Sequence, residues 1–285
     1  MNPAFAVRQM RPGELELALE WARQEGWNPG LDDAPAFSAA DPTGFFVGVV
    51  GEVPVGCISV VKYGESLAFV GLYMVHPDYR GRGYGKQLWD MGMASAGNRT
   101  VGLDGVVAQQ DNYRKSGFEF AHRTLRYHGL AVIPIAGEAP ARPVTRFSKD
   151  RLGELSRYDA GIFQAPREMF LSAWCGGGKT RRTVLMRSSG KVRGYGTIRR
   201  CFDGHKIGPL FANTAETASA ILTALITADG ATAVSLDVPL VNPAAVCVAE
   251  SFGLTPVFET ARMYRGTPPA MPSKRIFGIT TLELG

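Results

Sequence analysis

A weak internal repeat constrains this sequence more than any other feature. The segment VGLD at 101–104 is echoed by VSLD at 234–237, and Gly-Phe at 117–118 is echoed by Gly-Leu at 253–254. The two offsets, 133 and 136 residues, agree closely, which indicates a duplicated order of elements. We therefore predict two similar lobes, residues 1–130 and 143–285. The segment 131–142 contains three Pro or Gly residues and no periodicity, which is typical of a linker.

Apolar patterns predict the same kinds of element in both halves. In the first half they predict a helix after Gly13, strands at 45–50, 53–63 and 67–75, a helix around 88–91, a strand at 101–104, a helix at 112–116 and a strand at 118–127. In the second half they predict a helix at 168–174, strands at 183–187, 192–199 and 206–211, a helix at 217–227, a strand at 234–237 and a strand-like tail at 276–284. Hairpins followed by alternating strands and helices predict an α/β (α+β) fold, with a mixed, mostly antiparallel sheet flanked by helices in each lobe.

Composition and charge exclude several classes of protein. Hydrophobic residues make up 45% of the chain and charged residues 20%, which is ordinary for a globular protein and unlike a disordered one. No apolar run approaches the ~18 residues of a membrane span, and no signal-peptide pattern opens the sequence. The four cysteines are scattered, without metal-ligand spacing. We therefore expect a cytoplasmic protein with no membrane partner and no metal site.

The charge differs between the halves. Residues 1–130 have a net charge of −2 and residues 131–285 a net charge of +7. The basic half lacks a basic motif interleaved with aromatic residues, so we expect no nucleic-acid partner. A basic half is compatible with an anionic ligand or with a merely solvated surface, and both readings stay open.

The segment VHPDYRGRGYGK at 75–86 carries the strongest chemical signal. A predicted strand runs into three alternate glycines, after which a helix begins. Glycine lets the backbone approach a ligand closely, and the free N–H groups and dipole at a helix start favour an anion. Positive side chains are contributed by Arg80, Arg82 and Lys86. These features together predict a pyrophosphate site.

The spacing distinguishes between three phosphate-binding motifs. The dinucleotide pattern G-x-G-x-x-G does not fit, and the Walker pattern fails because Gln87 follows Lys86. The pattern R-x-x-G-x-G, formed by Arg80, Gly83 and Gly85, resembles the coenzyme A pyrophosphate loop of the GNAT superfamily of N-acetyltransferases. The preceding Val-His-Pro-x-Tyr and the later Tyr-x-x-x-Gly-Phe at 113–118 strengthen this resemblance, which covers residues 1 to about 130.

The resemblance implies acetyl-CoA as the donor and a primary amine, most simply of a small molecule, as the acceptor that attacks the thioester directly. The strand ending at Met74 and Val75 would part from its neighbour, and its free backbone would bind the pantetheine arm and stabilise the oxyanion. Implied contacts to the cofactor are Met74, Val75, Arg80, Gly81, Arg82, Gly83, Tyr84, Gly85, Lys86, Asn112 and Lys115. The motif tyrosine often protonates the departing thiolate in this family, and Tyr113 holds that position.

The attacking amine must be neutral, so a base or a water chain is needed. Two carboxylates are candidates for the base: Glu65, before the strand at 67–75, and Asp104, at the end of the strand at 101–104. Tyr63, Tyr73 and Trp27 are candidates for the acceptor pocket.

The second half resembles the family in a different way. The segments EGWNPG at 25–30 and TTLELG at 280–285 look like a GNAT subfamily with two tandem GNAT-like lobes, the second of which lacks the pyrophosphate loop. Here ANTAETA at 212–218 replaces the glycine-rich turn, so we expect one acetyl-CoA site, in the first lobe. The Walker-like segment at 173–180 lies between a predicted helix and a predicted strand, the reverse of a P-loop. A non-catalytic module that senses acyl-CoA or a metabolite is the alternative function.

Overall fold

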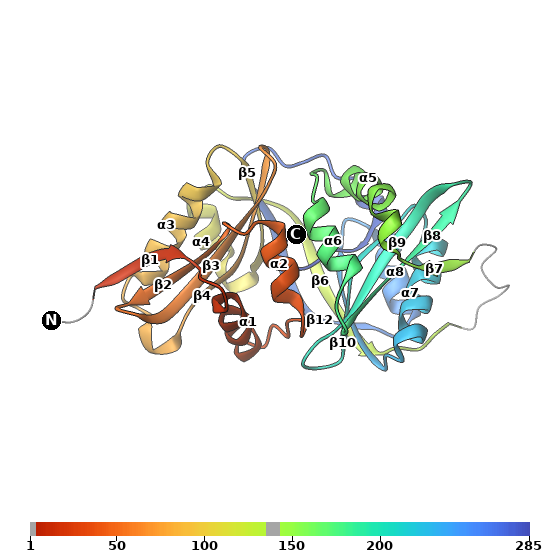
Figure 1. The fold of residues 1–285 in the computed structure, drawn as a ribbon, viewed down its shortest axis with the longest axis horizontal. Coiled ribbons are helices and arrows are strands. Elements are labelled where there is room, and N and C mark those ends of the chain that lie inside the picture. The colour runs from red at the N-terminus through yellow and green to blue at the C-terminus, as the bar shows by residue number, and fades with distance from the viewer. Residues whose placement is uncertain (1–3, 135–142) are drawn as a thin grey trace.

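The computed structural model describes residues 4–134 and 143–285, which form two lobes side by side (Figure 1). Residues 135–142 of the predicted linker lie outside the described part. The first half contains β1 (Phe5–Gln9), α1 (Glu14–Gln24), α2 (Asp33–Ala40), β2 (Phe45–Val50), β3 (Val53–Tyr63), β4 (Leu67–Val75), α3 (Tyr84–Ala96), β5 (Thr100–Val106), α4 (Gln110–Lys115) and β6 (Glu119–Leu130). The second half contains β7 (Val144–Arg146), α5 (Leu152–Phe163), α6 (Glu168–Gly176), β8 (Arg181–Ser188), β9 (Lys191–Arg200), β10 (His205–Ala212), α7 (Ala215–Asp229), β11 (Ala233–Pro239), α8 (Pro243–Ser251), β12 (Thr255–Arg265) and β13 (Ile276–Gly278).

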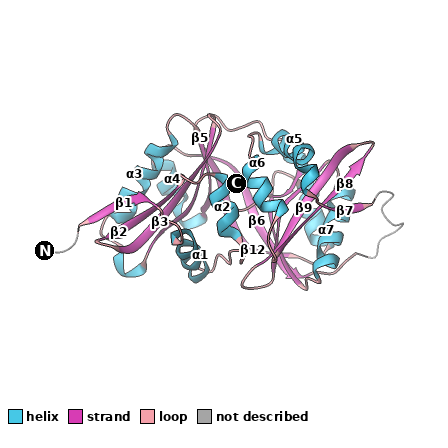
Figure 2. Ribbon diagram, in the orientation of Figure 1, coloured by secondary structure: helices cyan, strands magenta, loops and turns pink. Residues whose placement is uncertain are grey.

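The strands of both lobes join into one mixed sheet (Figure 2). Its order is β1-β2-β3-β4-β5-β12-β6-β11-β10-β9-β8-β7, and β13 pairs with β10. The pairs β4–β5 and β10–β11 are parallel, and the remaining pairs are antiparallel. The two parallel pairs occupy equivalent places in the two lobes, which agrees with the duplicated order of elements predicted from the repeat.

The two halves of the chain exchange their last long strands. β12, from the second half, pairs with β5 of the first half, with Ala261 opposite Gly105. β6, from the first half, pairs with β11 of the second half, with Tyr127 opposite Leu236. β12 and β6 pair with each other at the centre of the sheet. Residues from one half of the sequence are thereby placed beside the functional elements of the other.

Helices cover both faces of the sheet. On one face, α1, α2, α5 and α6 share a single core with the C-terminal tail, in which Phe37 of α2 stacks on Trp174 of α6. On the opposite face, α3 covers the first lobe and α7 and α8 cover the second. Successive side chains of β3 point to opposite faces of the sheet, so that Cys57 belongs to the shared core and Ile58 to the core under α3.

The local patterns explain several elements directly. Leu15, Leu19 and Ala22 are buried at helical spacing along α1, as predicted, and Glu16 is exposed on the other side. The β2–β3 hairpin turns at Gly51, whose φ of 61° favours glycine. Among the described residues, no helix is both long enough and apolar enough to cross a membrane.

The C-terminal tail differs from the prediction of a strand over 276–284. Only β13 is a strand, and it lies where β10 and β11 part, because Leu210 pairs with Gly278 and the Ile279 N–H donates to the Asp237 carbonyl at 2.9 Å. The chain beyond Ile279 runs through turns towards the first lobe. The tail therefore fills the parting of the second lobe with its own backbone and then reaches the first.

Candidate active site

β4 and β5 part halfway along their length. Their parallel pairing ends at Val70 and Leu103, so the end of β4 has no partner on that side among the described strands. A bulge in β4 sits at the same point: Leu72 has φ of 45°, rare for a leucine, and Leu72 and Tyr73 together oppose Ile58. The predicted parting of this strand is confirmed. Backbone groups of β4 are left free to bind an extended ligand.

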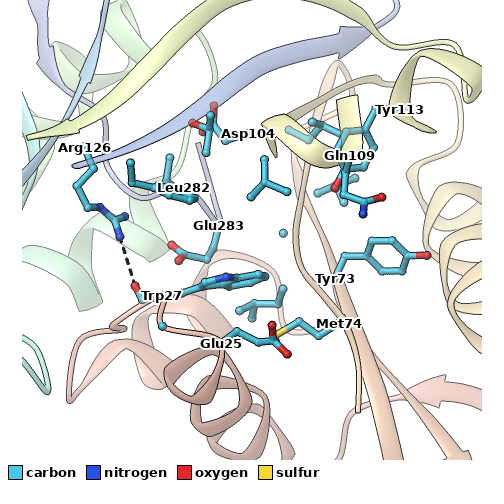
Figure 3. A pocket seen from close by; sticks show the side chains of 18 of the residues that line it. Glu25, Trp27, Tyr73, Met74, Asp104, Gln109, Tyr113, Arg126, Leu282 and Glu283 are labelled. Carbon is cyan, nitrogen blue, oxygen red and sulfur yellow. Dashed lines mark hydrogen bonds between the residues drawn. The ribbon is translucent and has the colours of Figure 1, made fainter. Parts of the chain in front are cut away.

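A cavity of about 840 Å³ lies beside this parting (Figure 3). It is lined by Glu25, Gly26, Trp27, Val70, Gly71, Leu72, Tyr73, Met74, Val75, Arg80, Leu103, Asp104, Val106, Gln109, Tyr113, Arg126, Val257, Phe258, Thr260, Leu282 and Glu283. Tyr73, Gln109 and Tyr113 lie on one side of the cavity in Figure 3, and Trp27, Arg126 and Glu283 lie on the other. The cavity thus brings together β4, β5, the loop after α1, both exchanged strands and the C-terminal tail.

The start of α3 has the properties of an anion site. Gly83 is its N-cap, with φ of 79°, and no side chain in the described part of the chain caps the first-turn N–H groups. A Cβ added at Gly83 would meet no atom within 4 Å, which leaves the approach open. A pyrophosphate group fits this cradle, since uncapped amides and the helix dipole both favour an anion.

The basic side chains around α3 are already paired. Arg80 Nε donates to the Val75 carbonyl at 2.8 Å, and its guanidinium also pairs with Glu25. Arg82 donates to the Asp78 carbonyl at 2.9 Å, and Lys86 pairs with Asp90. An anion at this turn would therefore meet the backbone amides and the Arg82 guanidinium, which has no carboxylate partner among the described residues, while Arg80 fixes the turn after β4.

The other predicted cofactor contacts differ in their surroundings: some pack against the sheet and others are exposed. The Tyr84 ring stacks on Phe5 of β1, with centroids 4.1 Å apart, so its side chain packs α3 on the sheet. A Cβ at Gly85 would lie 2.9 Å from the Tyr73 hydroxyl, which explains the third glycine. Asn112 and Lys115 are exposed on α4 and do not line the cavity. Contacts from these two side chains stay predictions.

Tyr113 projects from α4 over β5 into the cavity. Gly105 makes room for it, since a Cβ there would lie 2.7 Å from the ring. Burial among apolar neighbours, including Trp89, raises the pKa of Tyr113 to about 12, because desolvation disfavours the phenolate. Burial also raises the pKa of Tyr73, on the same side of the cavity. Tyr113 is therefore a neutral phenol near pH 7, the form that can donate a proton.

One candidate base and one candidate acceptor-pocket residue also lie outside the cavity. Glu65 stands in the turn before β4, 98% exposed and paired with Arg99 at 3.2 Å, too far from the cavity lining to act as a base there. Tyr63 is buried, and its hydroxyl donates to the Leu284 carbonyl at 2.9 Å. Tyr63 thus anchors the C-terminal tail and does not contact the acceptor, because the tail covers it.

Asp104 lines the cavity but is fully engaged in an ion pair. Its two oxygens accept from Nε and Nη2 of Arg262, each at 2.8 Å, and its side chain has no exposed surface. Arg262 belongs to β12, so this pair joins the exchanged strand to β5. The geometry assigns Asp104 a structural role in place of the predicted base.

Several cavity residues were not identified from the sequence because they belong to elements that lie far along the chain from the glycine-rich turn. The tail contributes Leu282 and Glu283, β12 contributes Phe258, and β6 contributes Arg126. Arg126 forms a bidentate pair with Asp237 at 2.7 and 2.9 Å. The one sequence signal for Arg126 was indirect: the repeat aligns Asp237 with Asp104. In the structure each of these two carboxylates pairs with an arginine of an exchanged strand.

The second lobe also holds the Trp27 loop in place. The Trp27 carbonyl accepts from Lys206 Nζ at 2.7 Å and from Arg126 Nη1 at 3.5 Å. Burial lowers the pKa of Lys206 to about 8. Trp27, predicted as an acceptor-pocket residue, lines the cavity on the side that faces the second lobe.

Comparisons with known proteins agree with this architecture. The family model for the acetyltransferase (GNAT) family matches residues 14–118, and that for the acetyltransferase (GNAT) domain matches residues 155–278. Holothin acyltransferase of Pseudoalteromonas sp. is 34% identical over 273 residues, covering 95% of this chain and 92% of that protein.

Two solved structures share the fold across both lobes. A putative acetyltransferase from Pyrococcus horikoshii aligns with a TM-score of 0.83 at 23% identity, covering 99% of this chain and 96% of the other. A tandem GNAT protein from the clavulanic acid biosynthesis pathway aligns with a TM-score of 0.64 at 15% identity, covering 93% and 100%. The family matches in both halves and the holothin acyltransferase relative show that this chain belongs to the GNAT acyltransferases and carries two GNAT domains in tandem.

Proposed function

We propose that this protein is an N-acyltransferase that moves an acetyl group from acetyl-CoA to a primary amine of a small molecule by direct attack. One observation carries the proposal: β4 parts from β5 beside a cavity that Tyr113 lines, and β4 then leads through the Arg80 turn to the uncapped start of α3. A thioester donor has a pyrophosphate, an extended arm and a sulfur leaving group. These three parts correspond to the α3 amides, the free edge of β4 and the Tyr113 phenol.

The residues then take distinct roles. The α3 amides around Gly83 hold the pyrophosphate, and the backbone of β4 beyond Val70 orients the pantetheine arm. An N–H of the same free edge stabilises the oxyanion; a donor of this kind is worth about 10²–10³ in kcat. Tyr113 donates its phenolic proton to the departing thiolate, for which its raised pKa keeps it protonated.

The acceptor enters from the side of the cavity formed by Trp27, Phe258 and Leu282. These apolar and aromatic walls favour an acceptor with a flat apolar body. The relative named holothin acyltransferase supports acyl transfer and makes holothin the first acceptor to test. We propose no nucleic-acid or membrane partner.

Thiol release tests the proposal. The protein is incubated with acetyl-CoA and with holothin, tryptamine, benzylamine or spermidine, and free coenzyme A is measured with a thiol reagent. We expect turnover with at least one amine, with the acetylated product confirmed by mass spectrometry. Tyr113→Phe should lower kcat by about 10²-fold, the usual range for a general acid, with little change in the Kd of acetyl-CoA.

Tyr127→Phe is the matched control, because Tyr127 is a buried tyrosine of the second-lobe core and does not line the cavity. Its kcat should equal that of the wild type. Acetyl-CoA binding by calorimetry without turnover on any amine would overturn the enzyme assignment in favour of an acyl-CoA sensor. Absence of acetyl-CoA binding would overturn both readings.

A further inference from the structure

The cavity contains one carboxylate without a cationic partner. Three carboxylates line it: Glu25, Asp104 and Glu283. Glu25 pairs with Arg80, and Asp104 pairs with Arg262. Within residues 4–134 and 143–285, neither an ion pair nor a hydrogen bond to the Glu283 carboxylate is found. Since Arg80 and Arg126 are themselves paired, Glu283 is the one charged group of the described cavity lining left available to a ligand.

The tail holds Glu283 in a defined place. The hydroxyl of Thr281 accepts from the N–H groups of residues 283 and 284, at 3.2 and 3.0 Å, and the Tyr63 hydroxyl donates to the Leu284 carbonyl. The backbone of Glu283 also lies directly against β4, because a Cβ added at Gly71 would be 2.2 Å from its carbonyl oxygen. The backbone of Glu283 is thereby fixed beside the parted strand, and its side chain lines the cavity.

The surroundings of Glu283 suit an amine. The residue is only 8% exposed, and Figure 3 shows it near Trp27 and Leu282, on the side of the cavity away from Tyr113. Within the described residues the Glu283 carboxylate has no protein partner, and a cationic ligand in this cavity would compensate its charge.

We propose that Glu283 is the general base of the acyl transfer, which makes it a catalytic residue supplied by the C-terminal tail. This inference rests on the proposed function. The acceptor arrives as a protonated amine and is attracted by the carboxylate. Glu283 takes one proton from its nitrogen, directly or through one water. The nitrogen lone pair then forms the C–N bond at the thioester carbonyl carbon, which gives a tetrahedral oxyanion, and collapse of this adduct breaks the C–S bond. Tyr113 gives a proton to the thiolate and the nitrogen loses its remaining excess proton to solvent as the amide forms. Tyr113 then regains a proton from solvent and Glu283 releases the one that it took.

Glu283→Gln tests this role, since it keeps the shape and removes the charge. With acetyl-CoA and the amine that the wild type turns over, we expect kcat to fall by about 10²-fold or more. The Kd of acetyl-CoA, measured by calorimetry, and the melting temperature should stay close to the wild-type values. The matched control is Glu216→Gln, an exposed glutamate at the start of α7 that does not line the cavity.

The pH profile separates a base from a merely structural group. In the wild type, where the carboxylate takes the proton from the bound amine, kcat should vary little with pH over the neutral range. In Glu283→Gln, only amine that has already lost its proton reacts, so kcat should rise about tenfold per pH unit over the same range. Glu283→Asp, which retains a carboxylate, should keep this weak dependence on pH at a lower kcat.

The outcomes are distinguishable. Wild-type turnover combined with an unchanged kcat and pH profile in Glu283→Gln would refute this inference and leave the proposed function intact. A kcat loss accompanied by an equal loss of acetyl-CoA affinity or of folding would also refute it, because Glu283 would then only hold the tail. Absence of wild-type turnover with every amine would refute the proposed function itself.

Discussion

Replacing Asp104 with asparagine tests whether this carboxylate holds the exchanged strand or acts in catalysis. Both of its oxygens accept from Arg262 at 2.8 Å, and the exposed fractions of the Asp104 and Arg262 side chains are 0% and 3%. Breaking a buried pair by changing one partner costs about 3–5 kcal/mol, because the other charge stays buried without compensation. We expect Asp104→Asn to lower the free energy of unfolding by this amount.

Urea denaturation followed by circular dichroism measures the effect. Asp111→Asn is the control, since Asp111 forms an exposed pair with Arg114 that contributes at most about 1 kcal/mol. The double variant Asp104→Leu/Arg262→Met removes both charges and should regain most of the lost stability. Recovery of this kind would show that the cost arises from the uncompensated guanidinium.

A different pattern would refute the reasoning. If Asp104→Asn lost less than about 1 kcal/mol of stability while kcat fell by about 10²-fold, the carboxylate would act in the reaction. The base would then be Asp104, as first predicted from its position at the end of its strand, and the ion pair with Arg262 would have to open during turnover.

Three further predictions follow from the same geometry. Burial lowers the pKa of Lys206 from 10.5 to about 8, so the unfolded chain binds more protons than the folded chain between these pH values. The free energy of unfolding should therefore rise with pH across this window, by at most about 3 kcal/mol. Urea denaturation at a series of pH values measures this rise, which Lys206→Met should abolish. Gly83→Val should raise the Kd of acetyl-CoA, measured by calorimetry, at least about tenfold. The strain of a valine at positive φ should lower the free energy of unfolding by only about 1–3 kcal/mol. An unchanged Kd would show that this loop does not bind the cofactor. Gly71→Ala should displace the tail, because a Cβ at position 71 would lie 2.2 Å from the Glu283 carbonyl oxygen, and it should lower kcat more than the affinity for acetyl-CoA. The control is Gly161→Ala in α5, which has open space around it and should change neither kcat nor this affinity.

Local signals in the sequence were sufficient to predict the backbone geometry around the start of α3. The three alternate glycines predicted a strand, a turn and a helix start at 75–86, and the structure places β4, Gly83 and α3 there. Tyr113 followed from a six-residue motif in the same way. These features are predictable because a tight turn and a helix N-terminus are determined by residues adjacent in the chain.

The acceptor side could not be predicted in this way. The interpretations of Tyr63 and Glu65 assumed that residues near β4 in the sequence face its ligand, but the tail covers Tyr63 and the turn carries Glu65 outward. Asp104 looked like a free carboxylate because its partner, Arg262, lies 158 residues away on an exchanged strand.

The sequence by itself determined that the chain has two related halves and that one of them carries a glycine-rich turn leading into a helix. Periodicity, glycines and the repeat are properties of neighbouring residues, so they can be read without knowing the fold. Only the tertiary structure decided that β6 and β12 change places and that β13 fills the parting in the second lobe. It also decided that the tail brings Glu283 to the first lobe. Strand partners and the course of a tail depend on which distant surfaces bury each other, and no local pattern specifies that choice.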